Sequence, residues 1–385
     1  MNIDLLGIIL LIGSFQGFFL SFLILHKGRT LFANRFLAAL LFAFGLTLLS
    51  LWLSDEGFYI SNPKLMFTLE GIQLIIFPLY FLYAKYLEEL SNKFSKMDLF
   101  HFVPFIVYKI FLIPFYFLNQ EIISAFQNSY MFENYPIQYI VFNWIIIFQG
   151  LIYMILVLKI TKIYEKHIKE FYSSISQIKL DWLKNATYLA IIITIGFMTE
   201  NILQLAGITF SEQFGFSSLL AAIYIYTIGY MGLSRSGVFT ELTQIESINS
   251  EKIIDQKNND RYEKSGLSIE KAEAYSKKLK QLMEMEKPYK NCKLTLRDIA
   301  SMLNISAHNL SEIINTKEEK NFFDFVNQYR IEEVKNDLLN PHNNNLTILA
   351  IAMEAGFNSK TSFNTLFKKY VGLTPSKYRE SMKSD

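Results

Sequence analysis

Two short stretches near the C-terminal end of the chain place polar side chains on one face at helical spacing. The first stretch presents His308, Asn309, Ser311, Glu312 and Asn315, and the second presents Lys360, Thr361, Asn364, Thr365, Lys368 and Lys369. Asn, Lys and Thr side chains have the donors and acceptors that read the base edges of DNA or bind its phosphates. A solvated helix face explains any one of these residues equally well. The prediction of a DNA contact therefore rests on the pattern, because both polar faces lie opposite an apolar stripe.

The elements that would hold these side chains occur twice between residues 294 and 379. When the two copies are aligned, Ile299-Ala300 falls on Ile351-Ala352, Asn304 on Gly356, and Ile305 on Phe357. Each copy is predicted to form a helix, a tight turn with one residue at φ > 0, and a second helix. Ser306 and the Asn358-Ser359 pair stand where each second helix needs an N-cap. The sequence thus predicts two helix-turn-helix units, at about residues 295–316 and 347–370.

The second copy carries a more specific pattern. It runs through Gly356-Phe357, Phe363, Phe367-Lys368-Lys369, Gly372, Thr374-Pro375 and Tyr378-Arg379. This pattern resembles the C-terminal signature of AraC/XylS-type transcription regulators, and residues 322–331 resemble the long helix that connects the two units in that family. Asn304 replaces a usual glycine and Ala355 a usual branched residue, but neither change breaks the predicted turn. The resemblance covers only the C-terminal part of the chain and implies sequence-specific binding to double-stranded DNA.

The charges of the two units differ. From Gly356 onward the basic residues are Lys360, Lys368, Lys369, Lys377, Arg379 and Lys383, and the acidic ones are Glu380 and Asp385. A cationic surface is what phosphate binding requires. The first unit is nearly balanced, since it contains Asp298, Glu312, Glu318 and Glu319. We therefore expect the second unit to bind the phosphate backbone more strongly.

The chain as a whole is too apolar for an ordinary soluble protein, and the excess lies before Gly237. Hydrophobic residues make up 51% of the 385 residues, and charged residues only 19%. With windows of about 20 residues, seven apolar spans precede Gly237. They lie near Leu5–Leu25, Phe36–Leu53, Leu65–Tyr86, Leu99–Leu118, Ile137–Ile160, Leu183–Leu205 and Phe216–Leu233. One such span is compatible with a buried core helix, but seven in succession predict a transmembrane bundle.

The basic residues between the spans predict the orientation. Lysine and arginine gather in alternate connections: Lys27, Arg29 and Arg35; Lys85, Lys93 and Lys96; Lys159, Lys162, Lys166, Lys169, Lys179 and Lys184; and Arg235. The other connections contain Lys64 alone. Because basic loops stay in the cytoplasm, we predict a multi-pass protein of the inner (cytoplasmic) membrane. Its N-terminus is expected outside and its C-terminus in the cytoplasm.

Polar residues inside the predicted spans are costly and so mark candidate functional positions. They are Glu70, Gln73, Lys109, Asn143, Glu200, Asn201 and Gln204. One interpretation is a hydrogen-bonded cluster that only holds the helices together, with Lys109 paired to a carboxylate of Glu70 or Glu200. The other is a polar cavity open to the exterior, which would be the sensory site.

Residues 237–266 are polar and charged, and we interpret them as a flexible cytoplasmic linker. An amphipathic stripe then runs to Pro288 and consists of Ile269, Ala272, Tyr275, Leu279, Leu282 and Met283. This stripe predicts either the first helix of the DNA-binding domain or, because it approaches heptad spacing, the contact helix of a homodimer.

Residues that could support catalysis or bind a metal are scattered. The five histidines lack ligand spacing, and the sequence contains no HExxH, GxSxG, P-loop or kinase signature. Cys292 is the single cysteine and is expected to be a free thiol. We predict no catalytic residue, no metal site and no cofactor.

These observations predict an all-α protein of three parts. A seven-helix transmembrane sensor domain occupies residues 1–236, the linker 237–266, and an AraC-type DNA-binding domain 267–385. The expected function is that of a membrane-bound one-component transcription regulator. Its partners would be double-stranded DNA, the lipid bilayer and an unknown small-molecule or membrane signal. The alternative is a transporter or integral-membrane enzyme with a regulatory tail, although no catalytic constellation or inverted repeat is evident.

Overall fold

The structure is a computed structural model that describes residues 5–27, 31–89, 93–119, 123, 137–206, 220, 223–232 and 269–381. All regular elements in these ranges are helices, which confirms the predicted all-α class. The chain forms two compact units. One consists of Met1–Ile163 and Leu180–Ser247, and the other of Tyr164–Lys179 and Ile248–Asp385.

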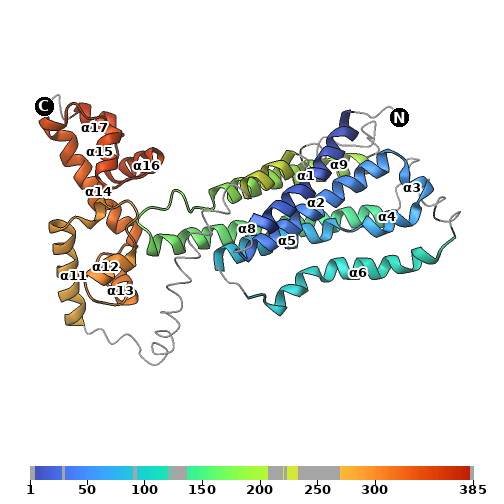
Figure 1. Ribbon diagram of the computed structural model, residues 1–385, viewed down its shortest axis with the longest axis horizontal. Coiled ribbons are helices and arrows are strands. Elements are labelled where there is room, and N and C mark those ends of the chain that lie inside the picture. Colours follow the sequence, from blue (N-terminus) through green and yellow to red (C-terminus); the bar gives the residue numbers. More distant parts are fainter. Residues whose placement is uncertain are drawn as a thin grey trace. The chain divides into compact units, whose positions relative to one another are not determined.

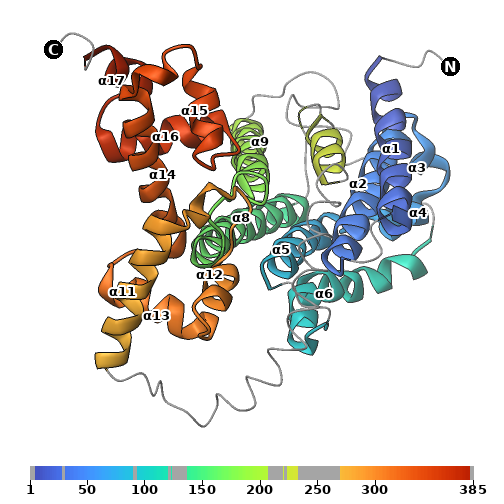
Figure 2. The same ribbon diagram turned by 60° about the vertical axis from the view of Figure 1, so that its left-hand side comes forward.

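The first unit is a bundle of long apolar helices. Its elements are α1 (Leu5–Lys27), α2 (Ala33–Asp55), α3 (Phe58–Ser61), α4 (Pro63–Leu69), α5 (Gln73–Glu89), η1 (Lys96–Phe102), α6 (Val103–Leu112), η2 (Ile113–Phe117), α9 (Asp181–Leu205) and most of α8 (Ile137–Phe171). Helices α1, α2 and α5 run side by side (Figure 1 and Figure 2). Small residues permit this packing, since a Cβ on Gly17 of α1 would lie 2.9 Å from the carbonyl oxygen of Leu41 in α2.

Six helical segments in the described ranges are long and apolar enough to cross a membrane. They are Gly7–His26, Ala33–Asp55, Lys64–Glu89, Lys96–Phe117, Ile140–Phe171 and Asp181–Leu203. These segments coincide with the first six predicted spans. The seventh predicted span, near Phe216–Leu233, falls partly outside the described residues, although residues 220 and 223–232 are helical.

The third of these segments is divided rather than continuous. Helix α4 ends at Leu69 and α5 begins at Gln73. Between them, Gly71 has φ 85°, and a Cβ there would meet the Tyr108 ring at 2.6 Å. The apolar composition of this segment gave no sign of the break, which depends on a close tertiary contact with α6.

The second unit is built around one long helix. Its elements are α11 (Ile269–Met285), η3 (Pro288–Lys290), α12 (Leu296–Met302), α13 (Ala307–Lys317), α14 (Phe322–Leu339), η4 (Pro341–Asn343), α15 (Ile348–Glu354), α16 (Lys360–Val371) and α17 (Pro375–Ser381). We call α12–α13 the first helix pair and α15–α16 the second. Helix α14 contacts both pairs and lies between them (Figure 1).

Helix α11 packs into the core of the second unit. Its Leu279 and Met283 are fully buried in one cluster with Ile299, Leu310 and Val326. This burial favours the first of the two interpretations of the amphipathic stripe, a helix that belongs to the C-terminal domain itself.

The boundary between the units differs from the one predicted. The sequence assigned residues 164–179 to the membrane domain, whereas they belong to the compact unit of the C-terminal region. These residues form the end of α8 and the connection to α9. The predicted linker 237–266 lies outside the described residues.

The turn at Gly356 yields a stability prediction with a matched control. Gly356 has φ 99°, and an added Cβ would lie 2.3 Å from the carbonyl oxygen of Tyr289. Gly372 has φ 81° but an added Cβ would meet nothing within 4 Å. Gly356→Ala should therefore destabilise by more than about 2 kcal/mol, because strain adds to the clash, and Gly372→Ala by only about 1 kcal/mol. Thermal unfolding of the full chain in detergent micelles measures the difference, and equal losses would contradict the geometry.

Candidate nucleic-acid interface

The turns of the two helix pairs have the same backbone hydrogen-bond pattern. Asn304 has φ 53° and Gly356 has φ 99°, so both positions predicted to need a positive φ have one. Equivalent backbone hydrogen bonds close the turns, from Ile305 N to Ala300 O at 3.0 Å and from Phe357 N to Ala352 O at 3.1 Å. The internal repeat in the sequence thus corresponds to a repeated local structure.

Each helix of the two pairs begins at a side-chain cap. Thr295 forms a reciprocal capping box with Asp298 at the start of α12, and the Thr347 side chain caps α15. Ser306 Oγ accepts the N–H of Asn309 at 3.1 Å, and Ser359 Oγ accepts the N–H of Ser362 at 3.4 Å. These caps begin α13 and α16 at the predicted residues.

Helix α16 exposes a polar face opposite its apolar one. Phe363, Leu366 and Phe367 are buried. The predicted contact residues on this helix are all exposed, and they are Lys360, Thr361, Asn364, Thr365, Lys368 and Lys369. The helix can therefore present amide, hydroxyl and ammonium groups to a ligand without disturbing the core.

Helix α13 exposes its predicted face less completely. His308 and Asn315 are exposed, whereas Asn309, Ser311 and Glu312 are partly buried. One carboxylate oxygen of Glu312 is fully buried and lacks a hydrogen-bond partner. With an acidic side chain and no exposed lysine among its predicted contact residues, α13 is a poorer phosphate-binding surface than α16.

A hollow of about 740 Å³ lies beside α16. Its lining consists of Asn364, Thr365, Lys368, Lys369, Thr374, Pro375 and Ser376. Thr374 and Ser376 were not among the predicted contacts. They come from the start of α17 and add two hydroxyl groups to the ammonium and amide groups of α16, which is a suitable set for a phosphate.

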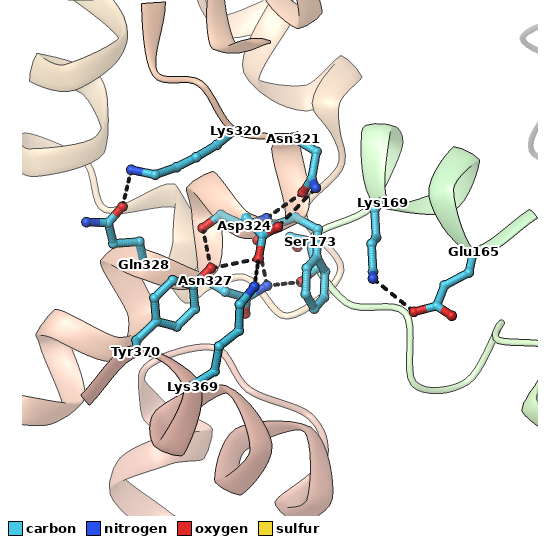
Figure 3. A network of polar contacts seen from close by, with 11 residues as sticks. Glu165, Lys169, Ser173, Lys320, Asn321, Asp324, Asn327, Gln328, Lys369 and Tyr370 are labelled. Carbon is cyan, nitrogen blue, oxygen red and sulfur yellow. Dashed lines mark hydrogen bonds and ion pairs between the residues drawn. The ribbon is translucent and has the colours of Figure 1, made fainter. Parts of the chain in front are cut away.

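Lys369 is engaged within the domain. Its Nζ lies 2.8 Å from Asp324 Oδ1, and the Tyr370 hydroxyl donates to the same oxygen at 2.7 Å (Figure 3). Burial would raise the pKa of Asp324, but these two hydrogen bonds and the charge of Lys369 lower it below the usual value. Lys368, one residue earlier, is exposed on the side of the hollow. The two neighbouring lysines therefore have different roles in the structure.

In the first unit, Lys109 binds backbone carbonyls rather than a carboxylate. Its Nζ donates to the carbonyl oxygens of Phe67 at 2.9 Å, Thr68 at 2.8 Å and Glu70 at 2.6 Å. These are carbonyls at the C-terminal end of α4, where a helix has unpaired acceptors and partial negative charge. The Glu70 carboxylate instead accepts the Tyr108 hydroxyl at 2.7 Å. Lys109 thus caps the divided third segment.

Two of the other predicted membrane residues, Asn143 and Asn201, form a separate hydrogen-bonded pair. Asn143 Nδ2 donates to Asn201 Oδ1 at 3.2 Å, and both residues are buried. Gln73 has a buried side-chain oxygen that accepts no hydrogen bond, and Glu200 is partly buried. The side chain of Gln204 lies outside the described residues.

In the part of the chain that the structure describes, no three His, Cys, Asp or Glu side chains gather to hold a metal ion. Cys292 is a partly exposed free thiol.

Comparisons with known proteins agree with this geometry. Residues 299–381 match the family model described as "Helix-turn-helix domain". The chain is also similar to the Msm operon regulatory protein of Streptococcus mutans serotype c, with 30% identity over 92 residues. That match covers 24% of this chain and 32% of the relative, so it spans about a third of the relative's length. No solved structure matches the chain.

The Lys109 cap gives a prediction for the first unit. Lys109→Met should leave three helix-end carbonyls without their donor, which costs about 1–3 kcal/mol for a buried group, and should lower both the yield and the melting temperature in micelles. Glu70→Gln keeps an acceptor for Tyr108 and should have a small effect. Lys64→Met, at an exposed lysine of α4, is the control for loss of charge. Equal behaviour of all three variants would show that the cap does not stabilise the helix end.

Proposed function

We propose that this protein is a membrane-bound one-component transcription regulator. The premise is the AraC-type helix-turn-helix domain at residues 299–381. Both helix pairs are helix-turn-helix units in this proposal, with α13 and α16 as the recognition helices. A signal that acts on the membrane helices changes how these two helices engage double-stranded DNA. The protein acts as a regulator and not as an enzyme.

The observation that carries the DNA-binding part is the repeated unit of capped helix, positive-φ turn and capped helix. A helix enters the major groove only if its outer face is free of core contacts, and α16 has its polar residues exposed and its apolar residues buried. Lys368 and the hydroxyl groups beside it suit phosphates, and Asn364 and Thr361 suit base edges. Helix α13 has less exposed polar surface, so we assign it a smaller share of the phosphate binding.

The membrane part of the proposal is supported by six apolar helical segments and by the asymmetry of their basic connections. This asymmetry favours an outer N-terminus and a cytoplasmic C-terminus in the inner membrane. Such an orientation keeps the DNA-binding domain in the compartment of the chromosome. The polar groups around Lys109 and around Asn143 are the proposed sensory positions, because polar side chains inside a bilayer are costly.

The DNA proposal is tested by selecting sequences from a random duplex pool with the full-length protein in micelles. Lys368→Ala should weaken binding to selected and random DNA alike, and the salt slope should fall by about one unit for the lost phosphate contact. Asn364→Ala should instead relax preference at particular base pairs, by about 1–3 kcal/mol. Lys369→Ala should also lower the thermal stability, because it removes the Asp324 pair.

The matched control is Lys277→Ala, which removes an exposed lysine on α11 and should leave the salt slope unchanged. If no sequence is enriched by the wild-type protein, the DNA-binding proposal fails. If all three interface variants weaken binding to selected and random DNA equally, the division between base and phosphate contacts is wrong.

The orientation is tested with reporter fusions in whole cells. Fusions at Gly57 and Gln127 should report the exterior, and fusions at Ser95 and Ser250 the cytoplasm, because the basic connections are retained inside. Activities of exterior and cytoplasmic reporters at the same site provide the internal control. An exterior signal at Ser250 would contradict the regulator proposal, since the C-terminal domain would then be separated from DNA.

A further inference from the structure

The connection between α8 and α9 is bound into the second unit. Tyr172 forms an isolated antiparallel bridge with Thr295, the residue that caps α12. Ser173 donates from its backbone N at 3.2 Å and from its Oγ at 2.7 Å to the carbonyl oxygen of Leu294. Ser173 is only 1% exposed. This loop is therefore part of the packed interior of the unit.

Arg330 of α14 depends on this loop for its hydrogen bonds. The guanidinium is 1% exposed and has five N–H donors. Two of them bind Ser173, from Nη1 to its carbonyl oxygen at 3.0 Å and from Nη2 to its Oγ at 3.0 Å. The other three reach Tyr289 O, Asn291 O and Asn327 Oδ1. Burial lowers the pKa of Arg330 to about 10, so the group remains charged at neutral pH and needs all these acceptors.

Asn327 holds the same loop residue from the previous turn of α14. Its Nδ2 donates to the Ser173 carbonyl oxygen at 2.9 Å, and Asn327 is also 1% exposed (Figure 3). Two buried polar side chains on one helix thus converge on a single serine. Buried polar groups are nearly always paired, so the site on α14 requires an occupant.

The loop also reaches the second helix pair. Asn358 Oδ1 accepts the Ser174 hydroxyl at 2.6 Å and the Ser176 hydroxyl at 3.2 Å. Asn358 lies in the turn, next to the N-cap Ser359 of α16. The segment 172–176 therefore contacts the start of the first helix pair, the connecting helix α14 and the turn of the second pair.

We infer that residues 172–176 are an intramolecular docking segment, and that this segment passes the sensor's state to both recognition helices. Its binding site, here called the seat, lies between the two helix pairs and consists of Leu294, Asn327, Arg330 and Asn358. The occupant is the chain's own loop, since α8 continues as one helix from Ile137 to Phe171 and leads directly into it. The docking follows from the contacts alone, whereas the relay role rests on the proposed function.

The physical reason for a relay is that the seat is shared. Movement of the loop changes hydrogen bonds to Leu294, to Arg330 and Asn327, and to Asn358 together. A signal can bias the domain only through an element with two arrangements, and a docked and an undocked loop would be two such arrangements. The connection through residues 237–266 would then serve as a tether.

Docking is tested by a disulfide across the bridge in the full-length protein in native membranes. Residues opposite each other in an antiparallel pair have Cα atoms about 4.5–5.5 Å apart, within the roughly 4.4–6.8 Å range of disulfides. Cys292 is the single cysteine, so Cys292→Ser gives a thiol-free background for Tyr172→Cys with Thr295→Cys. Mild oxidation should yield a monomer with the 172–295 disulfide, identified by mass spectrometry of the unreduced peptides.

The control pair is Tyr172→Cys with Lys277→Cys, which uses an exposed position on α11 and should stay reduced. Failure of the 172–295 pair to form, in a protein whose two thiols react with maleimide, would overturn the docking. A disulfide-linked dimer would also overturn it, because the seat would then hold the loop of a second copy.

The relay is tested by displacing the loop. Ser173→Tyr cannot fit the buried position, and Gln177→Tyr adds the same side chain at an exposed residue of the same loop. The first variant should shift the affinity of the full-length protein for its selected DNA by roughly 2- to 30-fold, the usual range of coupling, and the second should not. Ser174→Ala with Ser176→Ala removes only the bonds to Asn358 and should give a smaller shift in the same direction.

Wild-type affinity in both Ser173→Tyr and the Ser174/Ser176 double variant would overturn the relay. If Ser173→Tyr does not accumulate, the double variant decides alone. Absence of any selected sequence for the wild-type protein would instead reject the proposed function, while the disulfide would still report on docking.

Discussion

The buried guanidinium of Arg330 is the constraint on which the arrangement of the second unit depends. A charged group that is 1% exposed needs a hydrogen-bond acceptor for each of its N–H donors. The acceptors come from three separate parts of the chain. They are η3 and the residue after it, α14 itself, and the loop that follows α8. The same side chain lies over the Phe357 ring at 5.9 Å, at the turn of the second helix pair. One residue thus links the connecting helix to both ends of the domain.

The DNA-binding surface follows from the repeated turn. Equal hydrogen bonds at the Ile305 and Phe357 turns orient each second helix against its first, and N-caps set where each second helix begins. The two copies are not equivalent in charge, since α16 exposes lysines and α13 contains a partly buried Glu312. A regulator with this asymmetry would use its second helix pair for most of the attraction to the phosphate backbone and its first helix pair for orientation.

The same requirement for paired polar groups applies to the bundle of apolar helices in the first compact unit. The divided helix at Gly71 leaves carbonyls that would be costly in an apolar surrounding, and the Lys109 ammonium supplies their donor. Tyr108 packs on Gly71, and its ring stacks on the Phe142 ring with the two centroids 4.2 Å apart. Its hydroxyl donates a hydrogen bond to the Glu70 carboxylate. A break of this kind needs continuous support from neighbouring side chains, which makes it sensitive to changes in helix packing.

The sequence by itself determined the helical class, the apolar segments, the positive-φ turns at Asn304 and Gly356, and the caps at Ser306 and Ser359. These features depend on local periodicity and on backbone sterics, which neighbouring residues decide. Only the tertiary structure decided that Lys109 meets carbonyls instead of a carboxylate, that Lys369 pairs with Asp324, and that Ser173 enters the seat on α14. The partners in these contacts are between 39 and 157 residues apart. Spacing along the chain carries no information about such pairs, because they form only when folding brings distant polar groups out of water together.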